Sequence, residues 1–219
     1  MKTFIKTVGF ILILSFVLVA TSNKGEKTQP PVKTAEEIFE AYNGAVFRIR
    51  AVSEEKRTQM SGTGFFIDEN GTALTAAHVI NRCDNIEGFG GESESLGNFE
   101  IIKTDIKNDI ALIRIKEQTE NYTYLNISKK IPDYGEKVYV IGFPYGESIF
   151  ISDGVVSTPD TKVNGKDVTM LTIPITNGVS GGPIISATGE VVGVASAILE
   201  TNNAMAISPT LKDITKFTN

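Results

Sequence analysis

The sequence predicts an all-β fold, either a barrel or a sandwich. Short apolar or alternating runs recur along the chain, and no long helical pattern separates them. Turn sequences lie between many of these runs, and the 20 glycines suit tight turns and bends in strands. One short helix is expected near the N-terminus and another at the C-terminus.

The predicted elements begin after a polar segment. Residues 34–37, Thr-Ala-Glu-Glu, match a capping box and predict a helix start. Strands are predicted at 46–52, 62–67, 72–74, 99–102, 110–115, 137–141, 149–157, 168–173, 183–185 and 191–198, with turns at 68–71, 164–165 and 187–190. Ser208 followed by Pro209 predicts the start of a C-terminal amphipathic helix with Leu211, Ile214 and Phe217 on its apolar side.

The N-terminal residues 1–22 are predicted to be a signal peptide or a membrane anchor. Lys2 and Lys6 precede an apolar run at 8–20. As a helix this run would span about 20 Å, less than the roughly 30 Å of a bilayer core. Ala20 and Ser22 are small residues suited to cleavage after Ser22, so export is favoured, and an uncleaved anchor is the alternative. Residues 23–33 are predicted to be a linker before a domain at 34–219.

Composition excludes several classes of function. The formal net charge of −5 gives no electrostatic basis for binding nucleic acid. With 41% apolar residues, the chain is neither disordered nor a multi-span membrane protein. One cysteine cannot form an intrachain disulfide, and one histidine and one cysteine cannot build a structural zinc site. No metal is therefore expected.

Three residues carry candidate chemistry, although each has an ordinary structural explanation when taken alone. His78 follows a predicted strand, where a lone histidine is usually structural or solvated. Asp109 precedes a predicted buried strand, where aspartate often forms a turn. Ser180 has glycines at 178, 181 and 182, which predict either a glycine-rich hairpin or a tight turn open to a carbonyl. In the second case the Gly178 and Ser180 N–H groups could form an oxyanion site.

The order of these residues along the chain favours one arrangement. Residues 178–182 formally match the G-x-S-x-G elbow of α/β-hydrolases, but those enzymes place their histidine after the serine. No histidine follows Ser180. The order His78, Asp109, Ser180 is that of the chymotrypsin-type triad.

Six ordered motifs resemble those of trypsin-like serine proteases of the chymotrypsin fold, and most of all the protease domain of HtrA/Deg-type bacterial enzymes. They are Ser-Gly-Thr-Gly-Phe-Phe-Ile-Asp at 61–68, Ala-Leu-Thr-Ala-Ala-His-Val at 73–79, Asp-Ile-Ala-Leu-Ile-Arg at 109–114, the run from Tyr134 to Gly146, Gly-Val-Ser-Gly-Gly-Pro at 178–183 and Val-Gly-Val-Ala-Ser at 192–196. The resemblance covers the chain from about residue 34 to its end. No PDZ domain is expected to follow.

The resemblance implies two packed antiparallel β-barrels, at about 45–115 and 138–207, joined by a loop at 117–133. It implies a serine endopeptidase that hydrolyses protein or peptide substrates through an acyl-enzyme, without a metal or an organic cofactor. Ser180 would be the nucleophile, His78 the general base, and Asp109 the residue that orients the imidazole. The oxyanion would be received by the N–H groups of Gly178 and Ser180, together with that of Val179.

The resemblance also implies where substrate binds. Residues 195–198 would pair with the substrate backbone, with Ser196 close to Asp109. The implied substrate-binding residues are Pro174, Ile175, Ala195, Ser196, Ala197, Ile198 and Ala204. None of these can ionise, which predicts a preference for small-to-medium apolar residues before the scissile bond. Val179 replaces the aspartate with which digestive relatives capture a newly cut N-terminus, so that activation route is not expected.

The rival interpretation is a catalytically silent protein with a protease fold, which binds peptides or surface partners without cleaving them. Retention of all three triad residues beside a glycine-lined serine favours the enzyme. The sequence makes no prediction about the oligomeric state.

Overall fold

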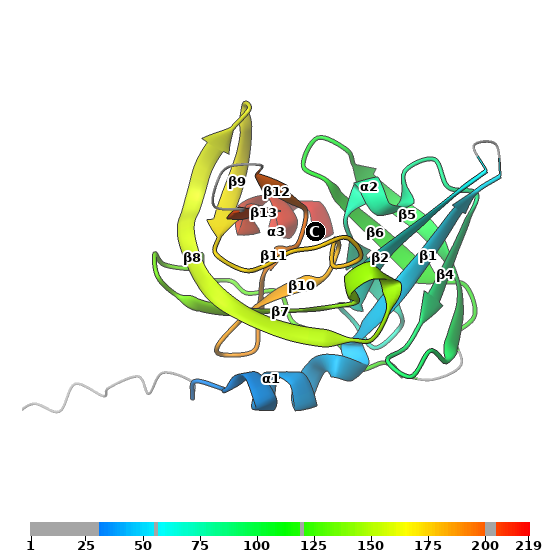
Figure 1. Ribbon diagram of the computed structural model, residues 1–219, viewed down its shortest axis with the longest axis horizontal. Coiled ribbons are helices and arrows are strands. Elements are labelled where there is room, and N and C mark those ends of the chain that lie inside the picture. The colour runs from blue at the N-terminus through cyan, green and yellow to red at the C-terminus, as the bar shows by residue number, and fades with distance from the viewer. Residues whose placement is uncertain (1–30, 55–56, 119–120, 200–204) are drawn as a thin grey trace, which may run out of the picture. The chain divides into compact units, whose positions relative to one another are not determined.

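The structure is a computed structural model that describes residues 31–54, 57–118, 121–199 and 205–219. In this part of the chain two curved sheets lie side by side, the first on the right of Figure 1 and the second on the left. For residues 197–199 only the backbone is described. The predicted signal peptide or anchor at 1–22 and the linker up to residue 30 lie outside the described residues.

The first sheet is a closed antiparallel barrel in the order β1-β2-β3-β6-β5-β4. Its strands are β1 (Val46–Ser53), β2 (Thr58–Phe66), β3 (Thr72–Thr75), β4 (Asn85–Phe89), β5 (Ser95–Asp105) and β6 (Ile110–Ile115), with α2 (Ala77–Ile80) after β3. Inside it, the Phe47 ring packs on Phe66 and Phe99 at centroid distances of 4.7 and 4.9 Å. The barrel expected over 45–115 is therefore confirmed. The strand β4 was not predicted, because its five residues include a glycine and only two apolar positions.

The second sheet has seven strands in the order β11-β10-β7-β8-β9-β13-β12. They are β7 (Lys137–Gly142), β8 (Phe150–Val163), β9 (Lys166–Leu171), β10 (Pro183–Ser186), β11 (Val191–Val194), β12 (Ala197–Leu199) and β13 (Met205–Pro209). The sheet curls so that β11 approaches β13, where the Val194 N–H donates to Ser208 Oγ at 2.9 Å. The expected all-β fold with two barrel-like halves is confirmed.

The C-terminal helix begins later than predicted. Ser208 and Pro209 belong to β13, and α3 (Leu211–Thr218) starts after the N-cap Thr210. Ser208 does not cap the helix, because its hydroxyl is buried and bonded to the Val194 N–H and the Pro209 carbonyl. The predicted strand at 191–198 is likewise two strands, β11 and β12.

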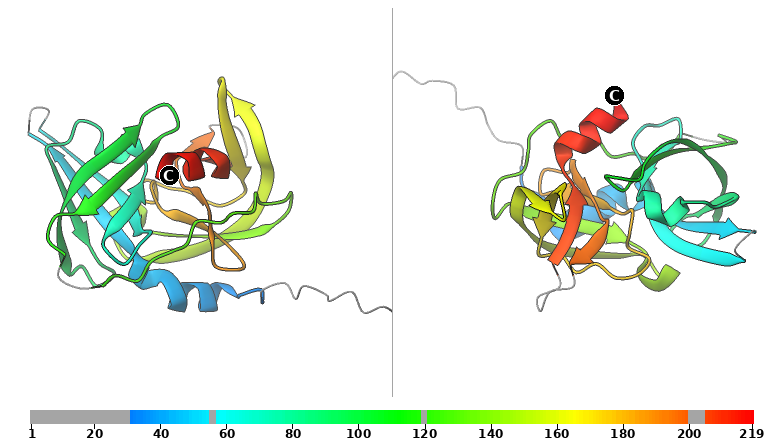
Figure 2. Two further views of the ribbon diagram at one scale, coloured as in Figure 1. Left: turned by 180° about the vertical axis from the view of Figure 1, so that it is seen from behind. Right: turned by 90° about the horizontal axis from the view of Figure 1, so that it is seen from above.

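The N-terminal helix packs on the second sheet, and the C-terminal helix contacts both sheets. The helix α1 (Ala35–Tyr42) has the predicted capping box at Thr34, continues into the 3-10 turn η1 (Asn43–Ala45), and packs against β7 and β8. The helix α3 contacts β6 of the first sheet and β11 of the second, and both views in Figure 2 show it beside the two sheets. Lys103 of β5 donates to the Phe217 carbonyl at 3.0 Å, which adds a second link across the halves. Among the described residues, no helix is long and apolar enough to cross a bilayer.

Candidate active site

His78 and Asp109 are brought together by the pairing of β3 with β6. Thr75 lies opposite Ala111 in this ladder, so the residues just after β3 and just before β6 are neighbours. His78 lies in α2, directly after β3. Asp109 has a φ of +58°, a left-handed conformation that aspartate tolerates better than most residues. The turn before it is held by Asp105, whose carboxylate accepts from the N–H and the side-chain amide of Asn108.

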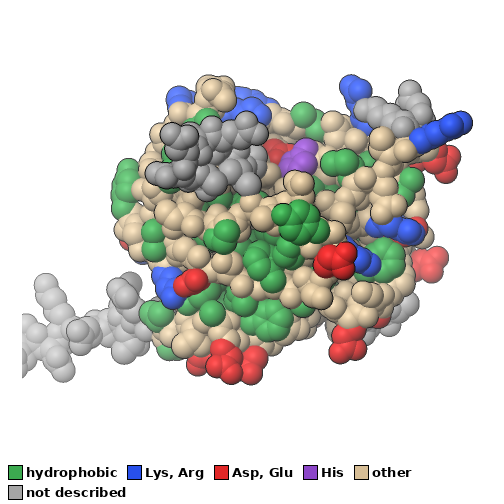
Figure 3. Space-filling model, in the orientation of Figure 1, with side chains coloured by type: hydrophobic (Ala, Val, Ile, Leu, Met, Phe, Trp, Pro, Cys, Tyr) green, Lys and Arg blue, Asp and Glu red, His purple; other side chains and the backbone are tan. Residues whose placement is uncertain are grey.

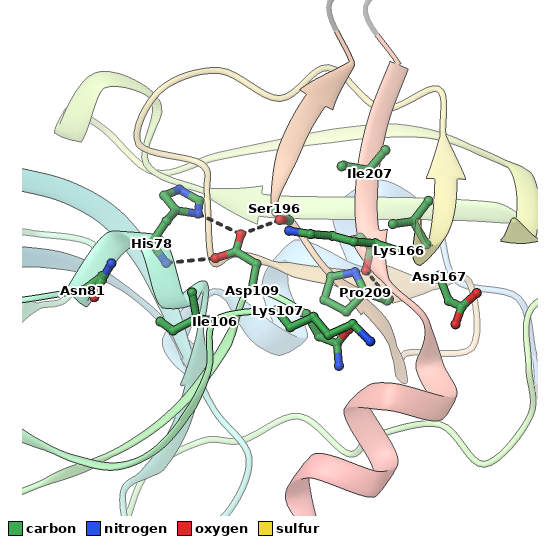
Figure 4. Close-up of a pocket in the computed structure, with 13 residues that line it drawn as sticks. His78, Asn81, Ile106, Lys107, Asp109, Lys166, Asp167, Ser196, Ile207 and Pro209 are labelled. Carbon is green, nitrogen blue, oxygen red and sulfur yellow. Dashed lines mark hydrogen bonds and ion pairs between the residues drawn. The ribbon is translucent and has the colours of Figure 1, made fainter. Parts of the chain in front are cut away.

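Asp109 accepts three hydrogen bonds that fix the imidazole (Figure 4). Its Oδ1 accepts from the backbone N–H of His78 at 2.8 Å, and its Oδ2 lies 2.8 Å from His78 Nδ1. Ser196 Oγ also donates to Oδ2, at 2.5 Å. Because a carboxylate only accepts, Nδ1 carries the proton, and Nε2 of a neutral imidazole is left with its lone pair. The purple side chain in Figure 3, the chain's one histidine, lies at the surface.

The surroundings of Asp109 act on its pKa in opposite directions. Burial of the carboxyl raises its pKa, but the hydrogen bonds from His78 and Ser196, together with the charge of His78, outweigh this effect. The net result is a pKa below the ordinary value of 3.8. Asp109 is therefore ionised at neutral pH and able to stabilise an imidazolium.

Ser180 lies in the loop between residue 175 and β10, on the second half of the molecule. Its hydroxyl donates to the Ser196 carbonyl at 3.4 Å, and no hydrogen bond joins it to His78 among the described residues. Ser196 therefore contacts two residues of the predicted triad, Asp109 through its hydroxyl and Ser180 through its carbonyl. Hydrogen bonds between catalytic groups are often long in the absence of substrate and tighten only in the complex.

The loop around Ser180 leaves two backbone donors without a protein acceptor. The N–H groups of Val179, Gly181 and Gly182 donate to carbonyls of Thr176, Ala195 and Val179 at 3.1, 2.7 and 2.9 Å. No such bond is made within the described chain by the N–H groups of Gly178 and Ser180. The expectation that Val179 takes part in an oxyanion hole is thereby corrected, because its N–H is already bonded within the loop.

The orientation of the Gly178 N–H is set by bonds to the carbonyls on either side of it. The Asn177 carbonyl accepts from the Tyr145 N–H at 2.6 Å, and the Gly178 carbonyl accepts from Thr63 Oγ1 at 2.7 Å. Gly178 has a φ of +92°, and a Cβ there would lie 2.2 Å from the Phe143 carbonyl oxygen. Only glycine fits this position without moving the backbone.

Thr63 of β2 connects the first barrel to this loop through two bonds, and to Phe143 after β7 through a third. Its hydroxyl donates to the Gly178 carbonyl and accepts from the Phe143 N–H at 3.2 Å, while its backbone N–H donates to the Ser180 carbonyl at 2.8 Å. The side chain is fully buried. Thr63 was not among the predicted site residues, although it lies within the motif at 61–68. Thr63 is a positioning residue that no spacing pattern revealed.

The predicted substrate-binding residues fall into different environments. Pro174 is exposed, whereas Ile175 is buried in the core of the second sheet. The N–H and carbonyl of Ala195 are bonded to Gly182 and Gly181 at 2.9 and 2.7 Å, which corrects the expectation that substrate pairing begins at Ala195.

Three further residues of the predicted binding set, Ser196, Ala197 and Ile198, lie next to or within an edge strand of the described sheet. The Ser196 N–H donates to the Ile207 carbonyl at 3.1 Å. Ala197 and Ile198 lie in β12, which pairs with β13 on one side and ends the sheet on the other. Ala204 lies outside the described residues.

The geometry above agrees with a comparison to known protein families. A profile described as a trypsin-like peptidase domain matches residues 62–194, which include all three predicted triad residues. The chain belongs to the trypsin-like peptidase family. Within the described residues, no group of His, Cys, Asp or Glu could hold a metal ion.

The chain is similar in sequence to HtrA- and DegP-type members of the family. It is 30% identical over 166 residues to a probable periplasmic serine endoprotease DegP-like of Hahella chejuensis, covering 74% of this chain and 34% of that protein. It is 31% identical over 156 residues to serine protease HTRA1 of Xenopus laevis, covering 68% of this chain and 34% of that protein. The chain thus spans about a third of the length of these relatives.

The fold is shared with solved structures of lower sequence identity. The Rv3671c protease of M. tuberculosis in its active form superimposes with a TM-score of 0.75 at 19% identity, over 95% of this chain and 92% of that one. This chain therefore shares its fold with that protease.

The lowered pKa of Asp109 predicts how stability depends on pH. A carboxyl whose pKa is lower in the folded than in the unfolded chain stabilises the fold where it is ionised. Its contribution should be complete above about pH 4 and be lost as the pH falls through the lowered value. From about pH 4 to about pH 2, the free energy of unfolding should fall more steeply for the wild type than for Asp109→Asn, as measured by urea denaturation. Asp160→Asn on β8 is the exposed control, and equal slopes for Asp109→Asn and the wild type would contradict the assignment.

Proposed function

We propose that this chain is a serine endopeptidase that uses Ser180, His78 and Asp109 as a catalytic triad. One observation carries the proposal: Ser196 links the Asp109–His78 pair to a serine whose loop presents two backbone N–H groups that have no acceptor among the described residues. This combination supplies a base, a nucleophile and an anion site.

The proposed reaction uses these groups in sequence. His78 Nε2 removes the Ser180 proton as Oγ attacks the scissile carbonyl, and the new oxyanion accepts from the Gly178 and Ser180 N–H groups. The imidazolium, stabilised by the Asp109 carboxylate, then gives its proton to the leaving amine. Water, deprotonated by the same imidazole, hydrolyses the acyl-enzyme and restores Ser180.

The open edge of β12 supports a peptide as the substrate. An unpaired strand edge offers backbone donors and acceptors that an extended peptide can satisfy. The Ser196 carbonyl, next to Ser180, is where such a peptide would begin to pair. Export of the chain is supported by the sequence of residues 1–22 and by relatives that are named as periplasmic endoproteases.

A direct test of the nucleophile uses Ser180→Ala. This variant should lose activity on the order of 10⁶-fold in kcat, because the triad acts as a unit. A fluorophosphonate should label the wild type and fail to label the variant. Ser95→Ala, at the exposed start of β5, is the control and should be labelled normally. A wild type that is folded but neither labelled nor active on casein would favour the silent peptide-binding alternative.

The role of Thr63 can be separated from simple stability with two substitutions. Thr63→Val keeps the shape but removes the hydroxyl, so the Gly178 carbonyl and the Phe143 N–H lose their partner. We expect kcat to fall about 10- to 100-fold with little change in KM, because a displaced oxyanion donor acts on the transition state. Affinity for a peptide aldehyde, whose adduct occupies the same anion site, should fall by a similar factor.

The serine variant is the matched control for this experiment. Thr63→Ser retains the hydroxyl and should keep kcat and aldehyde affinity near the wild-type values. If Thr63→Val changed thermal stability alone, with kcat and aldehyde affinity intact, Thr63 would have no role in positioning the oxyanion donor.

The residue before the scissile bond, P1, is proposed to be small to medium and apolar. Ile175 is buried and uncharged, and none of the other implied pocket residues can pair with a charged side chain. Burying an unpaired charge there would be costly, whereas apolar area contributes about 25 cal/mol per Å². A peptide library should show graded preference for Val, Leu, Ile, Ala and Met. Dominant cleavage after Arg, Lys, Asp or Glu would refute this pocket.

A further inference from the structure

A pocket of about 270 Å³ opens beside the triad on the side away from the Ser180 loop. Its lining comes from α2, the turn before β6, the start of β9, the end of β13 and Ser196, with no residue of 174–182. The predicted P1 wall at Pro174 and Ile175 is therefore not part of it. Figure 4 shows this pocket with His78, Asp109 and Ser196 at one end.

Two lysines give this pocket positive charge that no carboxylate cancels directly. Lys107 and Lys166 both line it, and neither forms an ion pair within the described chain. In Figure 4 the side chain of Lys166 extends across the pocket toward Ser196. Around these ammonium groups are the apolar side chains of Ile106 and Ile207 and the amide of Asn108.

The two carboxylates that line the pocket already have partners. Asp109 accepts from His78 and Ser196, as described above. Asp167 accepts from Lys162 Nζ at 2.6 Å. The pKa of Asp167 is lowered chiefly by that hydrogen bond, with a smaller contribution from the charge of Lys107. A ligand carboxylate in this pocket would therefore lie near two ammonium groups. Both carboxylates that line the pocket are already hydrogen-bonded within the protein.

The direction of a bound peptide places particular residues at this pocket. The chain runs from Ser196 into β12, away from the nucleophile, so an antiparallel peptide would run its residues before the scissile bond along β12. Side chains of an extended peptide alternate between two faces, with P1 and P3 on one face and P2 and P4 on the other. With P1 on the 174–175 side, as proposed above, P2 and P4 would face the pocket beside His78.

We propose, resting on the endopeptidase function proposed above, that this pocket selects substrates carrying Asp or Glu at P2 or P4. Lys107 and Lys166 are the specificity-determining residues, and the ligand class is an acidic, extended peptide segment with an apolar P1 residue. Both lysines are exposed, so the pairing is that of surface ions, which corresponds to about a 2- to 5-fold preference for each lysine.

The test uses fluorogenic peptides that share Val at P1 and differ only at P2 and P4, with Glu, Gln or Lys at each. For the wild type, kcat/KM should rank Glu above Gln and Gln above Lys, and the differences should shrink as salt is added. Lys107→Gln and Lys166→Gln should each reduce the preference for Glu. Lys166→Glu should favour Lys-containing peptides. Lys129→Gln, an exposed lysine that does not line the pocket, is the matched control and should leave the ranking unchanged.

Binding measured without turnover keeps this inference separate from the proposed function. The same peptides can be titrated into Ser180→Ala by fluorescence anisotropy, where the Glu peptides should again bind more tightly. Cleavage of every peptide at the same kcat/KM, or equal affinities for the variant, would overturn the inference and leave the endopeptidase assignment intact. An acidic preference in binding with no cleavage by the wild type would instead overturn the endopeptidase assignment alone.

Discussion

A trans peptide unit points its N–H and its carbonyl in opposite directions, and this constraint governs the loop that carries Ser180. The Gly178 N–H can face the cleft only while the Asn177 carbonyl is held on the other side, which the Tyr145 N–H does at 2.6 Å. The next carbonyl, that of Gly178, is held by Thr63. The conformation of the proposed anion site is thus set by hydrogen bonds to carbonyls that point away from it. Turning the 177–178 peptide unit would break the bond from Tyr145 and move the Gly178 N–H, a proposed oxyanion donor, out of position.

The same bonds join the two halves of the molecule at the site. His78 and Asp109 come from the first barrel and Ser180 from the second sheet, so their spacing depends on how the two pack. Thr63 forms hydrogen bonds across this boundary. Its carbonyl also accepts from Thr75 Oγ1 at 2.7 Å, just before the helix α2 that carries His78. A buried polar group left without its partner costs about 1–3 kcal/mol, so sliding of one half against the other is resisted at the site itself.

Sequence patterns were sufficient for the features that are local. The strand at 110–115 follows from burial of its apolar side chains, and the capping box at Thr34 follows from short-range hydrogen bonds. The family resemblance supplied the triad residues, and the structure brings His78 and Asp109 into contact and places Ser196 between Asp109 and Ser180.

Features that depend on distant backbone groups were not predictable in the same way. Thr63 and Gly178 are 115 residues apart, and only the folded chain shows that they bond. The bonding of the Ala195 and Val179 backbone groups could not be deduced, because it depends on the conformation of the Ser180 loop. Ser208 was predicted to cap the C-terminal helix, but its hydroxyl accepts from the Val194 N–H of the neighbouring strand β11. In each case a tertiary contact outweighed a local preference.

The free edge of β12 has a consequence for what kind of chain could enter the cleft. A peptide that pairs there becomes one more strand of the sheet, and its own N–H and carbonyl groups must be available for the new ladder. A segment inside a helix, or in the middle of a sheet, has already committed these groups to bonds of its own. Binding would therefore depend on the backbone conformation of a substrate before any of its side chains is recognised. Loosely structured or unfolded regions would be admitted, and the intact interior of a folded neighbour would be spared.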